Sequence, residues 1–350
     1  MSEAKHLEIV EDHGAMIEKI ENPSEVVQLA AVRANGSRAI KYIYEKGIIP
    51  SEAVQLAAVE KDGGEIQWIP NPSEAVQLAA VKKLGSSIEY IYAKGINPSE
   101  AVRLAATRSN SLVTVLKYIP TEFQTEEIQL EAVKSDGDAL KYIPNPTEEM
   151  QLIAVRKDNT AFEFLCRRIL PSENVQLAAV LHSGYNLRYI LEKTIPSEKV
   201  QFAAIANDPQ ALIWLLDSKC HISNELILLA TENDGSVIKL ILFKGRRIII
   251  PNTAIQLAAV RNYSFAIKWL YEAGIKPSEK VKLAAVKNCG LALEFIPNPS
   301  EAVQLAAVKQ NGHAIRFLYH SGITPSEEVK RAAIGRNKRA IIHTFKECEY

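Results

Sequence analysis

The stretch Pro-Ser-Glu-Ala-Val-Gln-Leu-Ala-Ala-Val stands at Pro72–Val81 and returns unchanged at Pro299–Val308. Variants of it fill the rest of the chain, at steps of 22–29 residues. Repetition at such a period is typical of a stack of small supersecondary units. Counting the opening segment from Met1, fourteen units fill all 350 residues. The position of the leading proline, called the proline slot below, is Pro23, Pro50, Pro72, Pro98, Gln124, Pro146, Pro171, Pro196, Ile222, Pro251, Pro277, Pro299 and Pro325.

Each unit is expected to hold two short helices. The first begins at the Pro-Ser-Glu signal, where we expect proline in the first turn and acidic residues at the positive end of the helix. Either an asparagine ahead of the proline or the serine after it provides the cap. A glycine such as Gly63 or Gly85 is expected to end the helix through a left-handed turn. A second helix follows, as in Ser37–Lys46 or Ser86–Lys94.

Unit length supports helices. Long units carry about four residues more than short ones in the second segment, and four residues are close to one helical turn. The added turn therefore lengthens a helix without rotating its buried face. The sequence predicts an all-α protein, an α-solenoid of about fourteen two-helix repeats. We expect a single domain over 1–350, with residues 1–22 and 325–350 as polar terminal cap repeats.

Three columns of residues predict the packing. Eight residues after the slot stands alanine in every unit but the first, as at Ala154, which predicts that another helix crosses closely there. A leucine column and an aromatic column, the latter including Trp214 and Trp269, are expected to be core. Two or three such side chains leave an isolated helix pair marginal, so stacking must complete the core.

Composition narrows the function. Lys plus Arg and Asp plus Glu number 41 each, which argues against general nucleic-acid binding. Four cysteines form no close pair, and the start resembles no signal peptide, so a cytoplasmic location is expected. No stretch is long and apolar enough to predict a membrane span. The seven histidines fall in different slots and no catalytic motif occurs, so we expect no enzyme, no catalytic residues, no metal and no cofactor.

A basic column is the best functional lead. It lies ten residues after the slot and is interrupted by Glu11, Glu60, Leu181, Ala206, Glu232 and Gly335. One interpretation is that each cation offsets the dipole at a helix end. The other is a stripe of cations that grips an acidic peptide or a phosphate-bearing ligand. The column comprises Arg33, Lys82, Arg108, Lys134, Arg156, Arg261, Lys287 and Lys309.

Two further features leave alternatives open. The doublets Arg167-Arg168 and Arg246-Arg247 are either solvated helix ends or an anion-binding rim, within the least regular units. A glutamine column, including Gln28 and Gln256, either forms a ladder between neighbouring helices or lines a ligand groove.

The stretch Gln304–Leu318, Gln-Leu-Ala-Ala-Val-Lys-Gln-Asn-Gly-His-Ala-Ile-Arg-Phe-Leu, resembles the uncharacterised Leu-Ala-Ala-Val-Lys-x-Asn-Gly-x-Ala-Leu-x-Tyr helical repeats of phages, giant viruses and bacterial effectors. The resemblance covers nearly the whole chain and departs in the central units and in the Pro-Ser-Glu opening. It implies an all-helical repeat of viral or host-interaction origin, and it brings no catalytic residues.

The leading hypothesis is a non-enzymatic scaffold that binds a protein partner on a concave face lined by one set of helices, with inhibition or sequestration of that partner as one form of the function. The alternative is a small anionic ligand, such as a nucleotide, held by the basic column and the arginine doublets.

Overall fold

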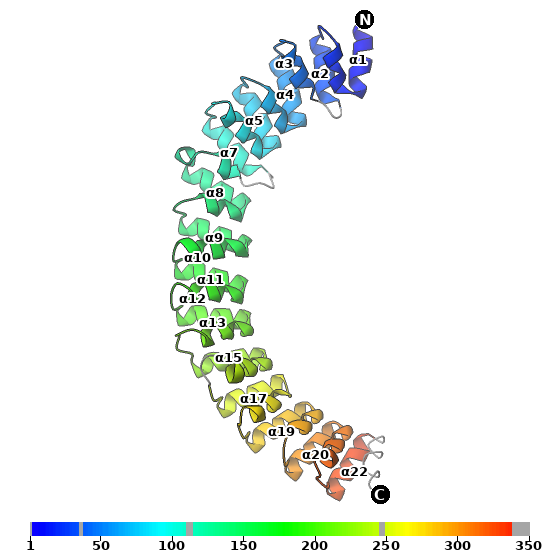
Figure 1. Ribbon diagram of the computed structural model, residues 1–350, viewed down its shortest axis with the longest axis vertical. Coiled ribbons are helices and arrows are strands. Elements are labelled where there is room, and N and C mark those ends of the chain that lie inside the picture. The colour runs from blue at the N-terminus through cyan, green and yellow to red at the C-terminus, as the bar shows by residue number, and fades with distance from the viewer. Residues whose placement is uncertain (1, 35–37, 110–114, 245–248, 338–350) are drawn as a thin grey trace. The chain divides into compact units, whose positions relative to one another are not determined.

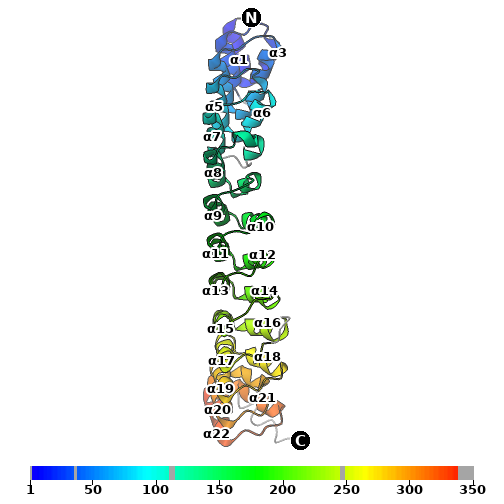
Figure 2. The ribbon, with the colours of Figure 1, turned by 90° about the vertical axis from the view of Figure 1, so that its left-hand side faces the viewer.

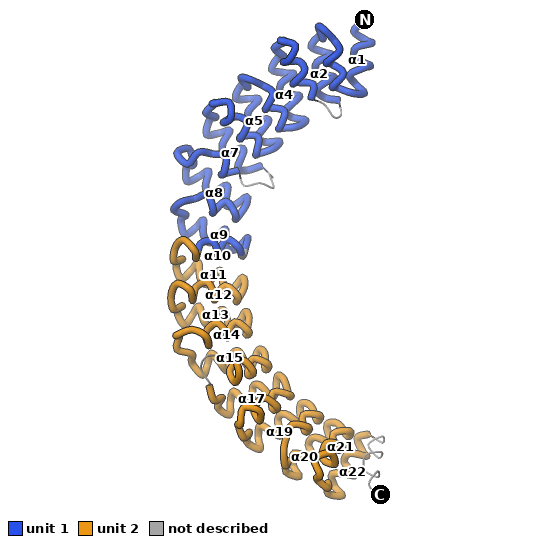
Figure 3. Tube along the Cα trace, viewed as in Figure 1, with its two compact units in different colours: residues 1–165 blue, residues 166–350 orange. Residues whose placement is uncertain are grey.

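The structure is a computed structural model that describes residues 2–34, 38–109, 115–244 and 249–337. Helices account for the regular structure of these residues, which contain no strand, so the predicted all-α helical repeat is confirmed. The chain divides into two compact units, Met1–Leu165 and Cys166–Tyr350, shown in Figure 3. Each unit is described by itself below, and the single domain with terminal caps stays a prediction.

Each repeat begins with one regular α-helix, called its first helix. Fourteen such helices lie in the described residues, as many as the sequence predicts. In the first unit they are α1 (Glu3–Asp12), α2 (Glu25–Arg33), α4 (Glu52–Lys61), α5 (Glu74–Lys83), α7 (Glu100–Arg108), α8 (Glu126–Ser135) and α9 (Glu148–Lys157). In the second unit they are α11 (Glu173–His182), α13 (Glu198–Asn207), α15 (Asn224–Asn233), α17 (Thr253–Asn262), α19 (Glu279–Asn288), α20 (Glu301–Gln310) and α22 (Glu327–Arg336).

The second segment of a repeat depends on its length. Most long repeats carry a second α-helix: α3 (Ala39–Glu45), α6 (Ile88–Ala93), α10 (Asn159–Arg168), α12 (Leu187–Leu191), α14 (Leu212–Leu216), α16 (Ile238–Phe243), α18 (Ala266–Glu272) and α21 (Ile315–His320). The long repeat of α7 differs, because the described part of its second segment holds only 3₁₀ turns. The short repeats instead carry a six-residue 3₁₀ helix: η1 (Gly14–Lys19), η2 (Gly63–Trp68), η6 (Gly137–Tyr142) and η10 (Gly290–Phe295). The predicted second helix is therefore present in the short repeats as well, in the 3₁₀ form because too few residues remain there for i→i+4 bonds.

Shorter 3₁₀ turns introduce most of the second α-helices. The turn η3 precedes α6, so the predicted helix Ser86–Lys94 is a 3₁₀ turn followed by a shorter α-helix, and Ser37 lies outside the described residues. The 3₁₀ turns are η3 (Gly85–Ser87), η4 (Val115–Tyr118), η5 (Thr121–Phe123), η7 (Gly184–Asn186), η8 (Pro209–Ala211), η9 (Gly235–Val237) and η11 (Gly312–Ala314).

Within each unit, first helices pack side by side in chain order, α1 on α2, α2 on α4, and so on (Figure 1). The second helices form another row beside them, as Figure 2 shows for α12, α14 and α16. The core between the two rows is made of Val, Ile, Leu and Ala, and Ala154, Ala204 and Ala259 of the alanine column are 0% exposed. Stacking of the repeats thus buries apolar side chains that a single repeat would leave exposed.

The serine after the slot caps the first helix. Its hydroxyl accepts from the backbone N–H three residues on, as at Ser51 with Val54 (3.4 Å), while the proline lies before the cap. The prediction that proline lies in the first turn of the helix was therefore wrong. The same hydroxyl donates to the first glutamate of the preceding repeat, at 2.5 Å from Ser51 to Glu25 and at 2.5 Å from Ser326 to Glu301. One side chain caps its own helix and ties it to the repeat before.

The glycines after the first helices do not form left-handed turns. Left-handed glycines occur at the ends of second helices, for example Gly47 at φ 74°. At Gly235 a Cβ atom would lie 2.5 Å from the carbonyl oxygen of Ala259 in the next repeat. Glycine is needed there because the next first helix comes this close. The prediction of a close crossing at the alanine column is confirmed, and the partner is this glycine.

Candidate binding surface

Each first helix carries a face on the side opposite its most buried positions. At about 100° per residue, positions four, five, eight and nine after the slot point one way, and positions three, six, seven and ten point the other way. We call the second set the outward face. It contains the leucine column at position six and the basic column at position ten. The leucine column on this face borders the core: Leu257 belongs to the cluster of buried core residues, and Leu283 and Leu305 pack against that cluster.

The apolar part of the outward face is half-buried. Leu78 and Ala79 of α5, or Leu283 and Ala284 of α19, are only partly covered by neighbouring helices. Leu257 of α17 is the most covered leucine of the column, at 8% exposure. The same position is half-buried in the other repeats at Leu7, Leu29, Leu56, Leu78, Leu104, Leu130, Leu152, Leu177, Phe202, Leu228, Leu283 and Leu305. This repeated, partly exposed apolar column is the candidate surface on the first helices.

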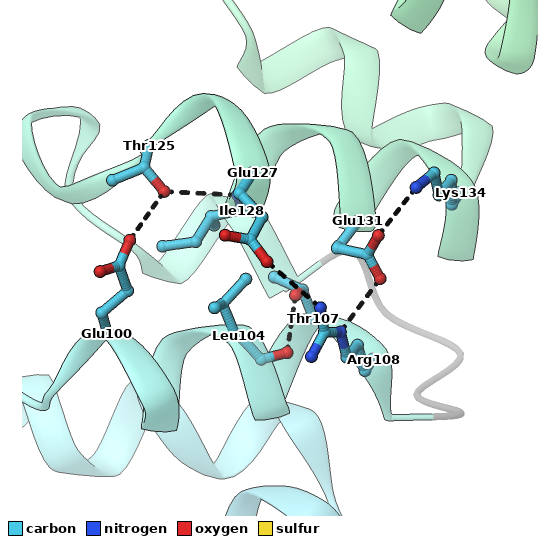
Figure 4. Close-up of polar contacts among 9 residues, drawn as sticks. All are labelled: Glu100, Leu104, Thr107, Arg108, Thr125, Glu127, Ile128, Glu131 and Lys134. Carbon is cyan, nitrogen blue, oxygen red and sulfur yellow. Dashed lines mark hydrogen bonds and ion pairs between the residues drawn. The ribbon is translucent and has the colours of Figure 1, made fainter.

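At α7 and α8 the cations of the basic column are neutralised by carboxylates of α8 (Figure 4). Arg108 Nε lies 3.0 Å from Glu131 Oε2, and Arg108 Nη2 lies 3.4 Å from Glu127 Oε1. Glu131 also accepts from Lys134 at 2.9 Å. Hydrogen bonds from Lys134 and Arg108 lower the pKa of the Glu131 carboxyl. Glu127 and Glu131 occupy positions three and seven of α8, so position ten of one repeat faces positions three and seven of the next.

At α17 and α19 the same three positions carry no carboxylate. Arg261 at position ten of α17 faces Lys280 and Ala284, at positions three and seven of α19. These residues line a hollow of about 450 Å³, together with Leu257, Leu283, Lys287 and Asn288. Within the described residues Arg261, Lys280 and Lys287 form no ion pair, and all three are exposed.

A second hollow of about 480 Å³ adjoins the first on the α15 side. It shares Leu257, Arg261 and Lys280 with its neighbour and adds Leu228, Ala254 and Ala258. Glu232 of α15 also lines it. Three first helices therefore present a continuous groove with a floor of leucine and alanine, cations from α17 and α19, and one carboxylate from α15. We call it the α15–α19 groove.

The remaining basic residues lie at helix ends. Arg33, Lys82, Arg156 and Lys309 are exposed in the last turns of α2, α5, α9 and α20, and Arg167 and Arg168 are exposed in the last turn of α10. A last-turn position suits the interpretation as dipole compensation for each of them. Arg246 and Arg247 lie outside the described residues. The structure thus brings Arg261 and Lys287 together in a groove and ties Arg108 and Lys134 into ion pairs.

Sequence reasoning missed Lys280 and Glu131. Each departs from the alanine that fills its position in the most regular repeats, Ala75 and Ala302 for Lys280, Ala79 and Ala306 for Glu131. A comparison of each repeat with the following repeat would have placed Lys280 and Glu131 beside residues of the basic column. Reading each column alone along the chain does not show this.

The glutamine column forms neither a ladder between helices nor a groove lining. Each Nε2 donates at 2.8–3.2 Å to the slot carbonyl five residues earlier, within its own repeat. Gln256, for example, donates to the Pro251 carbonyl at 2.8 Å. Both alternatives were wrong, because the core-side amide reaches a buried acceptor of its own chain first.

Most of the aromatic column is only partly buried, contrary to the prediction of core. Trp214 meets Tyr185 edge-on at 5.9 Å, and Trp269 stacks on Tyr263 at 5.3 Å. The Arg188 guanidinium lies 4.6 Å from the Tyr185 ring centre. These aromatics cover the row of second helices, while the aliphatic residues form the core.

One hollow in the first unit holds an unusual carboxyl group. It measures about 420 Å³ and is lined by Val32, Arg38, Ile40, Ala58, Lys61, Asp62 and Glu65. Burial and the neighbouring charge of Asp62 raise the pKa of Glu65 to about 7, against a smaller lowering effect of Arg38. Glu65 Oε2 is buried and has no hydrogen-bond partner among the described residues.

Other kinds of site find no support in the described residues. No group of three or more His, Cys, Asp or Glu side chains there could hold a metal ion. The helices of residues 2–337, apart from the stretches left undescribed, include none with the length and apolarity needed to cross a membrane. No family model matches the chain, and a search of curated proteins found no match.

Proposed function

We propose that the protein is a non-enzymatic helical repeat scaffold that binds a protein partner along the outward face of its first helices. The observation that carries the proposal is the leucine column, which is only half-buried at the edge of the core yet stays apolar in every repeat before the last, where Arg331 takes its place. Side chains that neither fill the core nor gain solubility are explained by a partner that covers them. Inhibition or sequestration of that partner belongs to the same proposal.

Two finer expectations rest on the sequence. A cytoplasmic location is supported by the cysteine usage, and Cys166 and Cys289 form no disulfide in the described part of the chain. Burial raises the pKa of the Cys166 thiol to about 12, so that this thiol is unreactive. A viral or phage origin is supported by the resemblance of the repeats alone.

The test is affinity capture of a protein, followed by binding of the purified partner to variants. Leu177→Ser together with Phe202→Ser removes apolar area from the outward face of α11 and α13. Ile195→Ser is the matched control, since Ile195 is 63% exposed in a connection between repeats. We expect the pair of outward-face changes to weaken binding and the control to leave it unchanged. Equal binding by both variants would contradict the proposal.

The alternative function, capture of a small anionic ligand, is favoured by the unpaired cations of the α15–α19 groove. The salt dependence of binding distinguishes the two functions. The affinity for a phosphate-bearing ligand falls steeply with ionic strength, whereas the affinity of a largely apolar protein contact does not. Joint charge reversal of Arg108, Lys134 and Arg156 would test the basic column of the first unit. Since Arg108 and Lys134 already face carboxylates, we expect that change to affect stability more than binding.

A further inference from the structure

We infer that the α15–α19 groove is a docking site for an acidic peptide segment with apolar residues, whose carboxylates take the place that Glu127 and Glu131 hold beside Arg108. The inference rests on the proposed function and names the chemistry of the partner. It starts from a comparison of two places in the same chain.

The α7–α8 pair shows what the surface does with a carboxylate. A guanidinium at position ten receives one carboxylate from position seven and a second from position three of the next helix. The lysine three residues after the first carboxylate completes the cluster at 2.9 Å. In α17 and α19 the corresponding cations are present as Arg261 and Lys287, but both carboxylates are missing.

The net charge of the α7–α8 pair differs from that of the α17–α19 pair in the same sense. The helices α7 and α8 carry three cations, Arg103, Arg108 and Lys134, against four carboxylates, Glu100, Glu126, Glu127 and Glu131, a balance of −1. The helices α17 and α19 carry four cations, Arg261, Lys280, Lys282 and Lys287, against Glu279 alone, a balance of +3. Even the acidic first turn is lost from α17, where Thr253 replaces glutamate. The third helix of the groove, α15, carries Glu225 and Glu232 and no cation, so the three helices together balance at +1. The positive charge is concentrated between α17 and α19, and this part of the groove is complementary to an acidic partner.

The floor of the groove distinguishes a peptide from a free anion. Leu257, Leu283, Ala258 and Ala284 line the two hollows beside the cations. A phosphate or a free carboxylate would bind the cations of the groove and leave the apolar floor exposed to water. Apolar side chains between carboxylates would cover the floor while the carboxylates meet Arg261, Lys280 and Lys287.

The groove is also held in shape before any partner arrives. Asn288 Nδ2 donates to the Arg261 carbonyl at 2.8 Å and to Ser264 Oγ at 2.7 Å, which joins α19 to α17. Asn262 Nδ2 donates to the Glu232 carbonyl at 3.1 Å, which joins α17 to α15. Such ties reduce the ordering cost that binding would otherwise incur.

The test uses the full chain and a fluorescent helical peptide in which glutamates flank a pair of leucines. Two peptide controls replace the glutamates with glutamines or the leucines with serines. Ala284→Glu installs at α19 the carboxylate that α8 carries as Glu131, so that the fold has already accommodated this group at this position. Ala79→Glu makes the same change at position seven of α5 and serves as the matched control.

We expect the parent peptide to bind and each peptide control to bind on the order of tenfold more weakly. Ala284→Glu should weaken binding to a similar extent, because the new carboxylate occupies Arg261 and Lys287, and Ala79→Glu should not. Lys280→Glu provides a second variant with the same expected loss. Unchanged binding by Ala284→Glu and Lys280→Glu would overturn the inference. Equal binding of the serine peptide, or its displacement by inorganic phosphate alone, would show an anion site without peptide specificity and would overturn it as well.

The proposed scaffold function and the groove inference can be refuted independently of each other. If a purified native partner binds Ala284→Glu normally and loses binding with Leu177→Ser and Phe202→Ser, which lie outside the groove, the scaffold function stands and the groove inference is wrong. If the peptide result holds and no protein partner depends on the outward face, the scaffold proposal is wrong.

Discussion

Arg108 in the last turn of α7 is held by Glu131 of α8 at 3.0 Å, across the boundary between two repeats. The same position in α17 is Arg261, which faces Ala284 instead of a glutamate. A column that looks uniform in the sequence therefore contains two kinds of cation. One kind joins repeats to each other, and the other forms no ion pair within the described residues.

The alanine column should not tolerate a larger side chain. Ala154 is 0% exposed and its carbonyl oxygen lies 3.2 Å from where a Cβ of Gly137 would stand. Ala154→Leu should lower the free energy of unfolding by about 1–3 kcal/mol through overpacking. Ala101→Leu, at an exposed position of α7, is the control and should change stability little. Denaturant unfolding measures both, and equal stability of the two variants would refute the packing.

The glycine that faces this column should be equally intolerant. Gly235→Ala would place a Cβ 2.5 Å from the Ala259 carbonyl oxygen and 2.8 Å from the Tyr263 nitrogen, both backbone atoms. Because neither atom can move alone, we expect a loss of about 1–3 kcal/mol. Gly335→Ala, within α22 and without any atom near the added Cβ, should instead stabilise slightly. Thermal unfolding of the two variants decides, and a stable Gly235→Ala protein would contradict the close approach.

The capping serine should couple neighbouring repeats. Ser51 caps α4 and donates to Glu25 of the preceding repeat at 2.5 Å. Ser51→Ala should cost about 0.5–2 kcal/mol, mainly through the lost cap. A double-mutant cycle with Glu25→Gln should give a coupling energy of about 0.2–1 kcal/mol, as for exposed polar pairs. A coupling energy of zero would mean that the serine acts within its own helix only.

Glu65 should make stability depend on pH. Its pKa is raised from 4.5 to about 7, so the folded state holds the proton more tightly than the unfolded state. The resulting stabilisation is fully present below pH 4.5 and is lost as the pH rises through about 7. Glu65→Gln should remove this loss, so that its melting temperature exceeds that of the parent at about pH 8 and the difference shrinks near pH 5. Glu89→Gln, an exposed carboxyl in α6, is the control, and identical pH profiles of the parent and Glu65→Gln would contradict the account.

The repeat, the first helices and the buried alanine could be predicted from the sequence because each recurs many times in the same slot. Local choices among chemically equivalent partners could not. Whether Gln256 bonds to a neighbouring helix or to Pro251 depends on which acceptor lies nearest, and the spacing along the chain does not decide it. The 3₁₀ form of Gly63–Trp68 likewise follows from how little chain remains before the next slot.

The candidate site was predicted only in part for a related reason. Arg261 and Lys287 stood out as members of a column, but their meaning depends on residues of the adjacent repeat. Lys280 and Ala284 become informative only when α19 is placed beside α17, and Glu131 only when α8 is placed beside α7.

The most direct measurement is a carboxylate swap read out by crosslinking. The variant combining Glu127→Ala and Glu131→Ala with Ala284→Glu frees Arg108 and Lys134 and engages Arg261 and Lys287. A photoreactive form of the glutamate–leucine peptide is then mapped by mass spectrometry on the parent and on the variant. The account predicts crosslinks to α17 and α19 in the parent and loss of those crosslinks in the variant, with new ones at α7 and α8. Crosslinks that stay at α17 and α19 after the swap would contradict it.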